Sequence, residues 1–112
     1  MQNNPEIEQI IEASVKIARD KKHEYVLTEH LLLALLRHQP FSNILGKYGV
    51  DVTMFDQELD SYLNSLAYLV KDVPDLQPRK TNALERTFNR ALTQVLFTGR
   101  RTISTVDLYL AI

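Results

Sequence analysis

The sequence predicts an all-α domain built from two similar halves. Three observations carry this prediction: apolar residues recur at helical spacing along most of the 112-residue chain, helix-capping residues and prolines stand at the starts of these segments, and no segment alternates as a half-buried strand does. The length suits a single hydrophobic core. We therefore expect a pseudo-twofold bundle of two helical repeats.

The first predicted helix begins at Asn4-Pro5. Asn can cap the free amides of a first turn, and Pro suits the first helical position because its missing N–H has no helical partner there. The residues that follow at helical spacing form one apolar face. They are Ile7, Ile10, Ile11, Ser14, Val15 and Ala18.

A short leucine-rich helix is expected over residues 28–38, with Thr28 placed where its side-chain oxygen can cap the start. Because the segment is apolar on nearly all sides, we expect it to be buried. His30 lies at its beginning and could be a ligand or a catalyst. A lone histidine at a helix start is more often a packed, hydrogen-bonded residue, and we favour that interpretation.

Two further helices and a linker complete the first repeat, which covers about residues 5–70. The third helix should follow Pro40 and end before Gly49, and Asp51 resembles the N-cap of the fourth. Residues 71–80 contain two prolines and are expected to be a linker.

The second repeat, about residues 81–112, has a helix between Thr81 and Gly99 and a last helix that begins near Ser104 or Thr105. A shift of 77 positions lays residues 7–35 on 84–112 without a gap, and five of the 29 aligned residues are identical. The apolar pattern therefore supports the repeat more than identity does.

The alignment makes Leu31 and Leu108 equivalent, and we expect both to be buried near the pseudo-twofold axis. The second repeat stops at Ile112, the equivalent of Leu35. From this early stop we expect an apolar patch formed by Leu108, Leu110 and Ile112.

Composition excludes several classes of protein. Without cysteine there is no disulfide or thiolate metal site, and a net charge of -1 gives no general attraction to nucleic acid or membrane. The longest apolar run, Leu31 to Leu36, is too short to span a bilayer, which needs about 20 residues. The polar start lacks the features of a signal peptide, so a cytoplasmic location is expected.

Motifs of catalysis and cofactor binding are also missing. No HExxH pair or GxSxG serine occurs, and Gly46-Lys47 lacks the other residues of a phosphate-binding loop. We therefore expect no catalytic residue, no cofactor and no metal in this chain, and we interpret it as a binding module.

Three stretches resemble the Clp N-terminal repeat domain family, and its ClpA branch most. They are HEYVLTEHLLLALL (23–36), GVD (49–51) and GRRTISTVDLYLAI (99–112). The resemblance implies a non-catalytic domain that receives protein substrates and adaptors and precedes the AAA+ modules of an ATP-dependent unfoldase. It further implies a ClpS-type adaptor as the partner, delivering N-degron proteins for degradation.

The resemblance also implies the partner-binding residues: Glu24, Glu29, Thr81 and Arg86, with His23 as a further candidate. Each has a structural alternative as a solvated turn acid, an N-cap or an exposed helix residue. Family domains continue for some thirty residues beyond the equivalent of Ile112. An alternative is therefore a free-standing Clp N-like protein that binds or blocks the adaptor or substrates without an ATPase. A small helical nucleic-acid binder is a third alternative and rests only on the basic segment 79–112.

Overall fold

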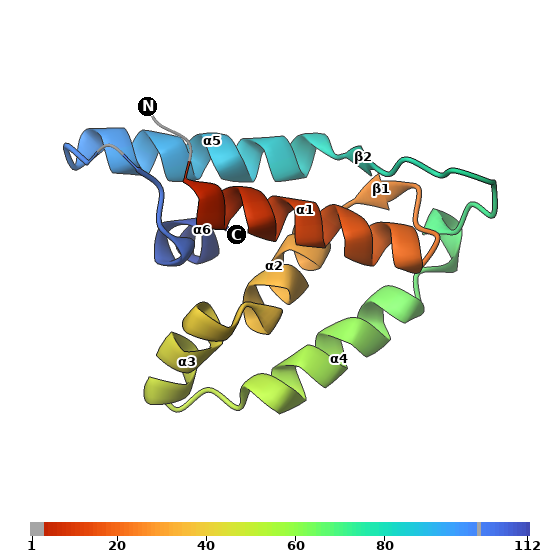
Figure 1. The fold of residues 1–112 in the computed structure, drawn as a ribbon, viewed down its shortest axis with the longest axis horizontal. Coiled ribbons are helices and arrows are strands. Elements are labelled where there is room, and N and C mark those ends of the chain that lie inside the picture. The colour runs from red at the N-terminus through yellow and green to blue at the C-terminus, as the bar shows by residue number, and fades with distance from the viewer. Residues whose placement is uncertain (1–3, 101) are drawn as a thin grey trace.

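The computed structural model describes residues 4–100 and 102–112 and confirms the all-α class and its two repeats (Figure 1). The first repeat contains α1 (Pro5–Asp20), β1 (Tyr25–Val26), α2 (Thr28–Arg37), α3 (Gln39–Lys47), α4 (Val52–Asn64) and the 3-10 turn η1 (Ala67–Leu69). The second contains β2 (Arg79–Lys80), α5 (Asn82–Phe97) and α6 (Thr105–Ala111). No helix in these described ranges is long and apolar enough to cross a bilayer.

The predicted helix ends agree with the structure at most positions. The side chains of Asn4, Asp51 and Thr81 each accept a hydrogen bond from a backbone amide of the first turn, at 2.9, 3.0 and 3.2 Å respectively. Gly49 and Gly99 follow the ends of α3 and α5 with φ of 83° and 77°. Such left-handed backbone is easily adopted only by glycine, so these two residues end their helices.

The predicted cap at Thr28 is wrong. The N-cap of α2 is Leu27, which has no side-chain oxygen, and Thr28 is already the first helical residue. The Thr28 hydroxyl donates instead to a carboxylate oxygen of Glu29 at 3.1 Å. In the second repeat the cap is likewise one residue earlier, at Ser104, and Thr105 begins the helix. The two threonines are structurally equivalent, but neither is a cap.

A small parallel sheet was not predicted. Tyr25 pairs with Arg79 and Val26 with Lys80, so β2 occupies the end of the predicted linker 71–80. Strands of two residues are too short to show alternation, and the sequence therefore carried no signal for them. The pair joins the connection between α1 and α2 to the start of the second repeat.

Helix α2 lies at the centre of the core, where it contacts α1, α3 and α4 of its own repeat and α5 and α6 of the other (Figure 1). As expected, Leu31 and Leu108 are both completely buried. Helix α6 packs mainly on α5. The same leucine position thus anchors the second helix of each repeat.

The expected apolar patch is present for two of its three residues. Leu110 is 75% exposed and Ile112 is 40% exposed, whereas Leu108 is buried. The repeat-equivalent residues of Leu110 and Ile112 are Leu33 and Leu35, and both are fully buried. Equivalent positions therefore have different surroundings in the two repeats, because α3 and α4 pack on α2.

Candidate partner-binding site

The parallel pair of β1 and β2 brings two segments that are distant in sequence to one place. The backbone amide of Arg79 donates to the carbonyl of Glu24 at 2.9 Å, and that of Thr81 donates to the carbonyl of Val26 at 3.2 Å. Helices α2 and α5 begin directly after these strands. Since the strands are parallel, both helices start at the same edge of the pair.

The four sequence-predicted contact residues lie on these two segments. Glu24 precedes β1 and Glu29 is in the first turn of α2, while Thr81 caps α5 and Arg86 is exposed one turn further along it. Among residues 4–100 and 102–112, no hydrogen bond or ion pair joins these four side chains to one another. The fold brings their segments together through the backbone alone.

Three of the four have other bonds within the fold. The carboxylate of Glu24 lies 3.6 Å from the amine of Lys71, and Glu29 accepts from the hydroxyl of its neighbour Thr28. The hydroxyl of Thr81 has two structural bonds: it caps α5 and also donates to the carbonyl of Val26 at 3.1 Å. Thr81 is therefore a structural residue whatever else it contacts.

The fifth candidate, His23, is only 1% exposed, and its ring points into the protein. Its Nδ1 lies 2.8 Å from Nε2 of His30, which is itself completely buried. The rings meet edge to face, with centroids 5.1 Å apart. A ring in this position cannot touch a docked protein, so His23 is not kept as a contact residue.

The protonation of the histidine pair, His23 and His30, follows from its bonds. The amide of Leu27 donates to Nδ1 of His30 at 2.8 Å, so this nitrogen carries a lone pair and the proton is on Nε2. His30 must then donate to Nδ1 of His23. Burial lowers the pKa of His30 to about 4, with smaller contributions from His23 and Lys21. Burial also lowers the pKa of His23.

Sequence comparison of the repeats did not reveal the role of His30, but the structure does. Its repeat equivalent is Asp107, and both are the third residue of their helix. A carboxylate oxygen of Asp107 accepts from the amide of Ser104 at 2.8 Å, just as His30 accepts from Leu27. Burial alone would raise the pKa of Asp107, but bonds from Arg100 and Ser104 outweigh it and lower the pKa. Different side chains thus perform the same capping.

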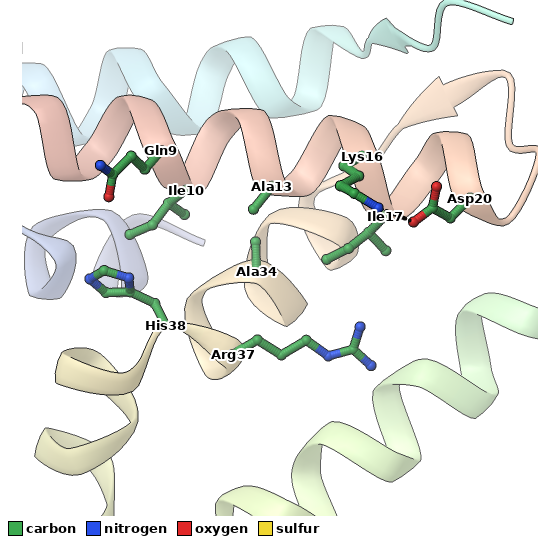
Figure 2. A pocket seen from close by; sticks show the side chains of 9 residues that line it. All are labelled: Gln9, Ile10, Ala13, Lys16, Ile17, Asp20, Ala34, Arg37 and His38. Carbon is green, nitrogen blue, oxygen red and sulfur yellow. Dashed lines mark hydrogen bonds and ion pairs between the residues drawn. The ribbon is translucent and has the colours of Figure 1, made fainter.

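A second surface feature is an open groove of about 320 Å³ between α1 and α2 (Figure 2). Its apolar floor includes Ile10 and Ala34. At the rim, Figure 2 shows Arg37 extending away from α1 toward α4, where it bonds to Asp56 at 2.9 Å. His38 bonds to Glu6 at 2.8 Å. Arg37 and His38 are thus bonded within the domain, as expected of a structural joint between helices.

No group of three or more potential metal-ligating side chains lies together in the part of the chain that the structure describes.

A bundle of two helical repeats, with a small parallel strand pair between them, defines a class of small all-α repeat domains. The chain belongs to the family described as "Clp repeat (R) N-terminal domain", whose model matches residues 3–112. Domains of this family are non-catalytic binding domains within Clp ATPases.

Curated relatives agree with this family and come from two of its branches. The chain is 29% identical over 107 residues to "ClpA homolog protein" of Fuscovulum blasticum, and the alignment covers 95% of the chain and 14% of that protein. It is 40% identical over 83 residues to "Chaperone protein ClpB 1" of Parasynechococcus marenigrum (strain WH8102), and this alignment covers 73% of the chain and 9% of that protein. The chain therefore spans a small part of either relative.

Solved structures show the same fold at low identity. A chain from "Preliminary structural investigations of a malarial protein secretion system" superposes with a TM-score of 0.87 at 14% identity, covering 99% of this chain and 76% of that one. The Hsp104 N-terminal domain from Candida albicans superposes with a TM-score of 0.78 at 15% identity, covering 91% and 67%. At these identities the likeness establishes the fold alone.

Proposed function

We propose that this chain is the substrate- and adaptor-receiving N-terminal domain of a ClpA-like, ATP-dependent unfoldase of the cytoplasm. Its partner is a ClpS-type adaptor that delivers N-degron proteins, and ATP hydrolysis belongs to AAA+ modules of the parent chain. Membership of the Clp N-terminal family supports the binding role, and the match to a ClpA homolog along 95% of the chain supports the branch. The ClpB relative has higher identity over a shorter stretch, so the test of the proposed branch is whether this chain binds the adaptor.

One observation carries the proposal: the β1–β2 pair sets the segment with Glu24 and Glu29 beside the segment with Thr81 and Arg86. The segments that carry the four candidate residues are far apart in the sequence and lie side by side in the fold, which supports a shared partner. Two carboxylates and a guanidinium can form charge-assisted hydrogen bonds of both polarities. Such an arrangement fixes the orientation of a partner and disfavours partners of the wrong charge pattern.

The test is a titration of the purified chain with a ClpS-type adaptor. Glu24→Arg should remove most of the affinity and leave the thermal melt nearly unchanged, because a half-exposed ion pair contributes little stability. Glu58→Arg is the matched control, since it makes the same charge change at an exposed position of α4. Equal affinities for wild type and Glu24→Arg would contradict the proposal, as would a wild type that does not bind.

A double variant separates binding from the internal ion pair. Glu24→Arg combined with Lys71→Glu restores the pair of residues 24 and 71 with reversed polarity. If Glu24 contacts the adaptor directly, the double variant should bind as weakly as the single one. Recovery of affinity would show instead that only the internal pair matters.

A further inference from the structure

The histidine pair is attached directly to the two acids of the proposed docking site. His23 precedes Glu24 in sequence, and His30 follows Glu29. The 2.8 Å bond between the rings therefore joins the backbone on the two sides of β1. The backbone of His23 is also held at the end of α1, since its amide donates to Ala18 at 2.8 Å.

Protonation of either ring is incompatible with this set of bonds. A second proton on His30 must go to Nδ1, where the Leu27 amide already donates. A second proton on His23 must go to Nδ1, where His30 donates. In either case two N–H groups would face each other, and one hydrogen bond would be lost.

The charged groups around the pair give it no carboxylate that would favour protonation. Lys21, at the end of α1, lowers the pKa of both rings after the larger effect of burial. The nearby acids are bonded elsewhere. Glu24 pairs with Lys71, and Asp72 pairs with Lys22. Asp60 of α4 pairs with Lys21, and Glu29 of α2 accepts from the Thr28 hydroxyl. Strand β2 supplies only the exposed cations Arg79 and Lys80.

We propose that the histidine pair is a positioning element, which fixes the spacing of Glu24 and Glu29 while both rings are neutral and releases it in acid. The inference rests on the proposed function for its biological consequence, namely weaker adaptor docking at low pH. The bond itself can be tested without an adaptor. Neither histidine touches the partner, so both act through the acids beside them.

The first experiment follows the ring nitrogens and the backbone amides by NMR between pH 7.5 and 4. Both rings should carry their proton on Nε2 and stay neutral at pH 6.5, where a free imidazole is about half protonated. The amide signals of Glu24 and Glu29 should then shift together as His30 is protonated, by more than the shift that their own carboxylates produce in His30→Asn. Two rings that titrate independently near pH 6.5, or Glu24 and Glu29 amides that shift no more than they do in His30→Asn, would overturn the proposal.

The second experiment uses His30→Asn. An Asn at this position can still accept from the Leu27 amide, as Asp107 accepts from Ser104, but it is too short to reach His23. In this variant the amides of Glu24 and Glu29 should show only the acid response of their own carboxylates. Adaptor affinity at pH 7.5 should fall about five- to tenfold, as expected if the competent arrangement becomes a minor population.

The matched control is His38→Asn, which removes the histidine at the other end of α2, bonded to Glu6. His38→Asn should keep both the coupled shifts of the Glu24 and Glu29 amides and the affinity for the adaptor. Any pH dependence that comes from the adaptor itself affects this control and His30→Asn equally. Wild-type affinity in His30→Asn would overturn the positioning role. A wild type that binds no adaptor contradicts the proposed function, and the NMR result then decides the histidine pair alone.

Discussion

The hydroxyl of Thr81 donates a hydrogen bond to the carbonyl of Val26 at 3.1 Å, and the reverse connection has the same form: the side-chain amide of Asn4 donates to the carbonyl of Ile103 at 3.0 Å. The two donors are the N-caps of α1 and α5, and donors and acceptors are each related by the repeat offset of 77. Each repeat therefore uses the cap of its first helix to hold the loop before the second helix of the other.

Replacing Thr81 by Ala should lower the free energy of unfolding by about 1–2 kcal/mol, because the cap of α5 and the bond to Val26 are both lost. Thr81→Ser keeps the hydroxyl and should cost much less. Urea unfolding of the two variants provides the measurement. An alanine variant as stable as wild type would contradict the structural role. Because of this role, adaptor contact at Thr81 must be tested with variants whose stability is known.

Local and non-local features differ in how well the sequence predicts them. The helices begin and end near their predicted positions because capping and apolar spacing act within a few residues, as at Asp51 and Gly99. The strands and the histidine pair depend on which segments meet in space. The pairing of Tyr25 with Arg79 leaves no local pattern, and neither does the bond of His23 to His30.

The alignment of the repeats predicted equivalent backbone but not equivalent chemistry. Leu27 and Ser104 have nearly the same dihedral angles, with ψ of 168° in both, yet only Ser104 has a capping oxygen. In the candidate site, the sequence located the two segments that the β1–β2 pair joins. The sequence placed His23 among the contact residues. It could not show that this ring is buried, because the burial of a histidine depends on packing across the whole fold.

Leucines at equivalent repeat positions should differ in their contribution to stability according to burial. Replacing Leu31 or Leu108 by Ala should cost about 2–5 kcal/mol, because both are fully buried. Leu33→Ala should cost a similar amount, whereas Leu110→Ala should change stability by less than about 0.5 kcal/mol, since Leu110 is 75% exposed. Denaturant melts of the four variants check this contrast. Equal costs at Leu33 and Leu110 would mean that Leu110 is covered.

Stability should decrease as the pH falls from about 6.5, and His30 should account for much of the decrease. Its pKa is about 4 in the folded chain and about 6.5 in the unfolded chain, so the unfolded chain binds the proton more readily between these values. The part of the free energy of unfolding that depends on neutral His30 is complete above pH 6.5 and is lost as the pH falls through 4. Over this range it amounts to about 3 kcal/mol. His23 is shifted in the same direction and adds to the trend.

The measurement is the free energy of unfolding by urea between pH 7 and pH 5, a window above the normal pKa of the carboxylates. Wild type should lose stability with a slope of up to about 1.4 kcal/mol per pH unit for each histidine. His30→Asn should lose at least half of the slope, and His38→Asn should keep it. An unchanged slope in His30→Asn would show that the ring is not held neutral by the fold.

Arg86 is exposed in the second turn of α5 and has no ion-pair partner among the residues that the structure describes. Its repeat equivalent on α1 is Gln9, which is also exposed. Arg86→Gln therefore introduces a side chain that the fold already accepts at this position, and stability should stay within about 0.5 kcal/mol of wild type. If Arg86 contacts the adaptor, affinity should fall about fivefold or more, close to 1 kcal/mol.

The variant that combines Arg86→Gln with Gln9→Arg moves the arginine to the equivalent position of the other repeat and keeps the net charge. Its affinity for a ClpS-type adaptor should equal that of Arg86→Gln alone, because α5, unlike the start of α1 that carries Gln9, begins beside the segment with Glu24. Isothermal titration of the three proteins decides between a local contact and a general effect of charge. Recovery of wild-type affinity in the double variant would show that net charge, and not the position of Arg86, determines binding.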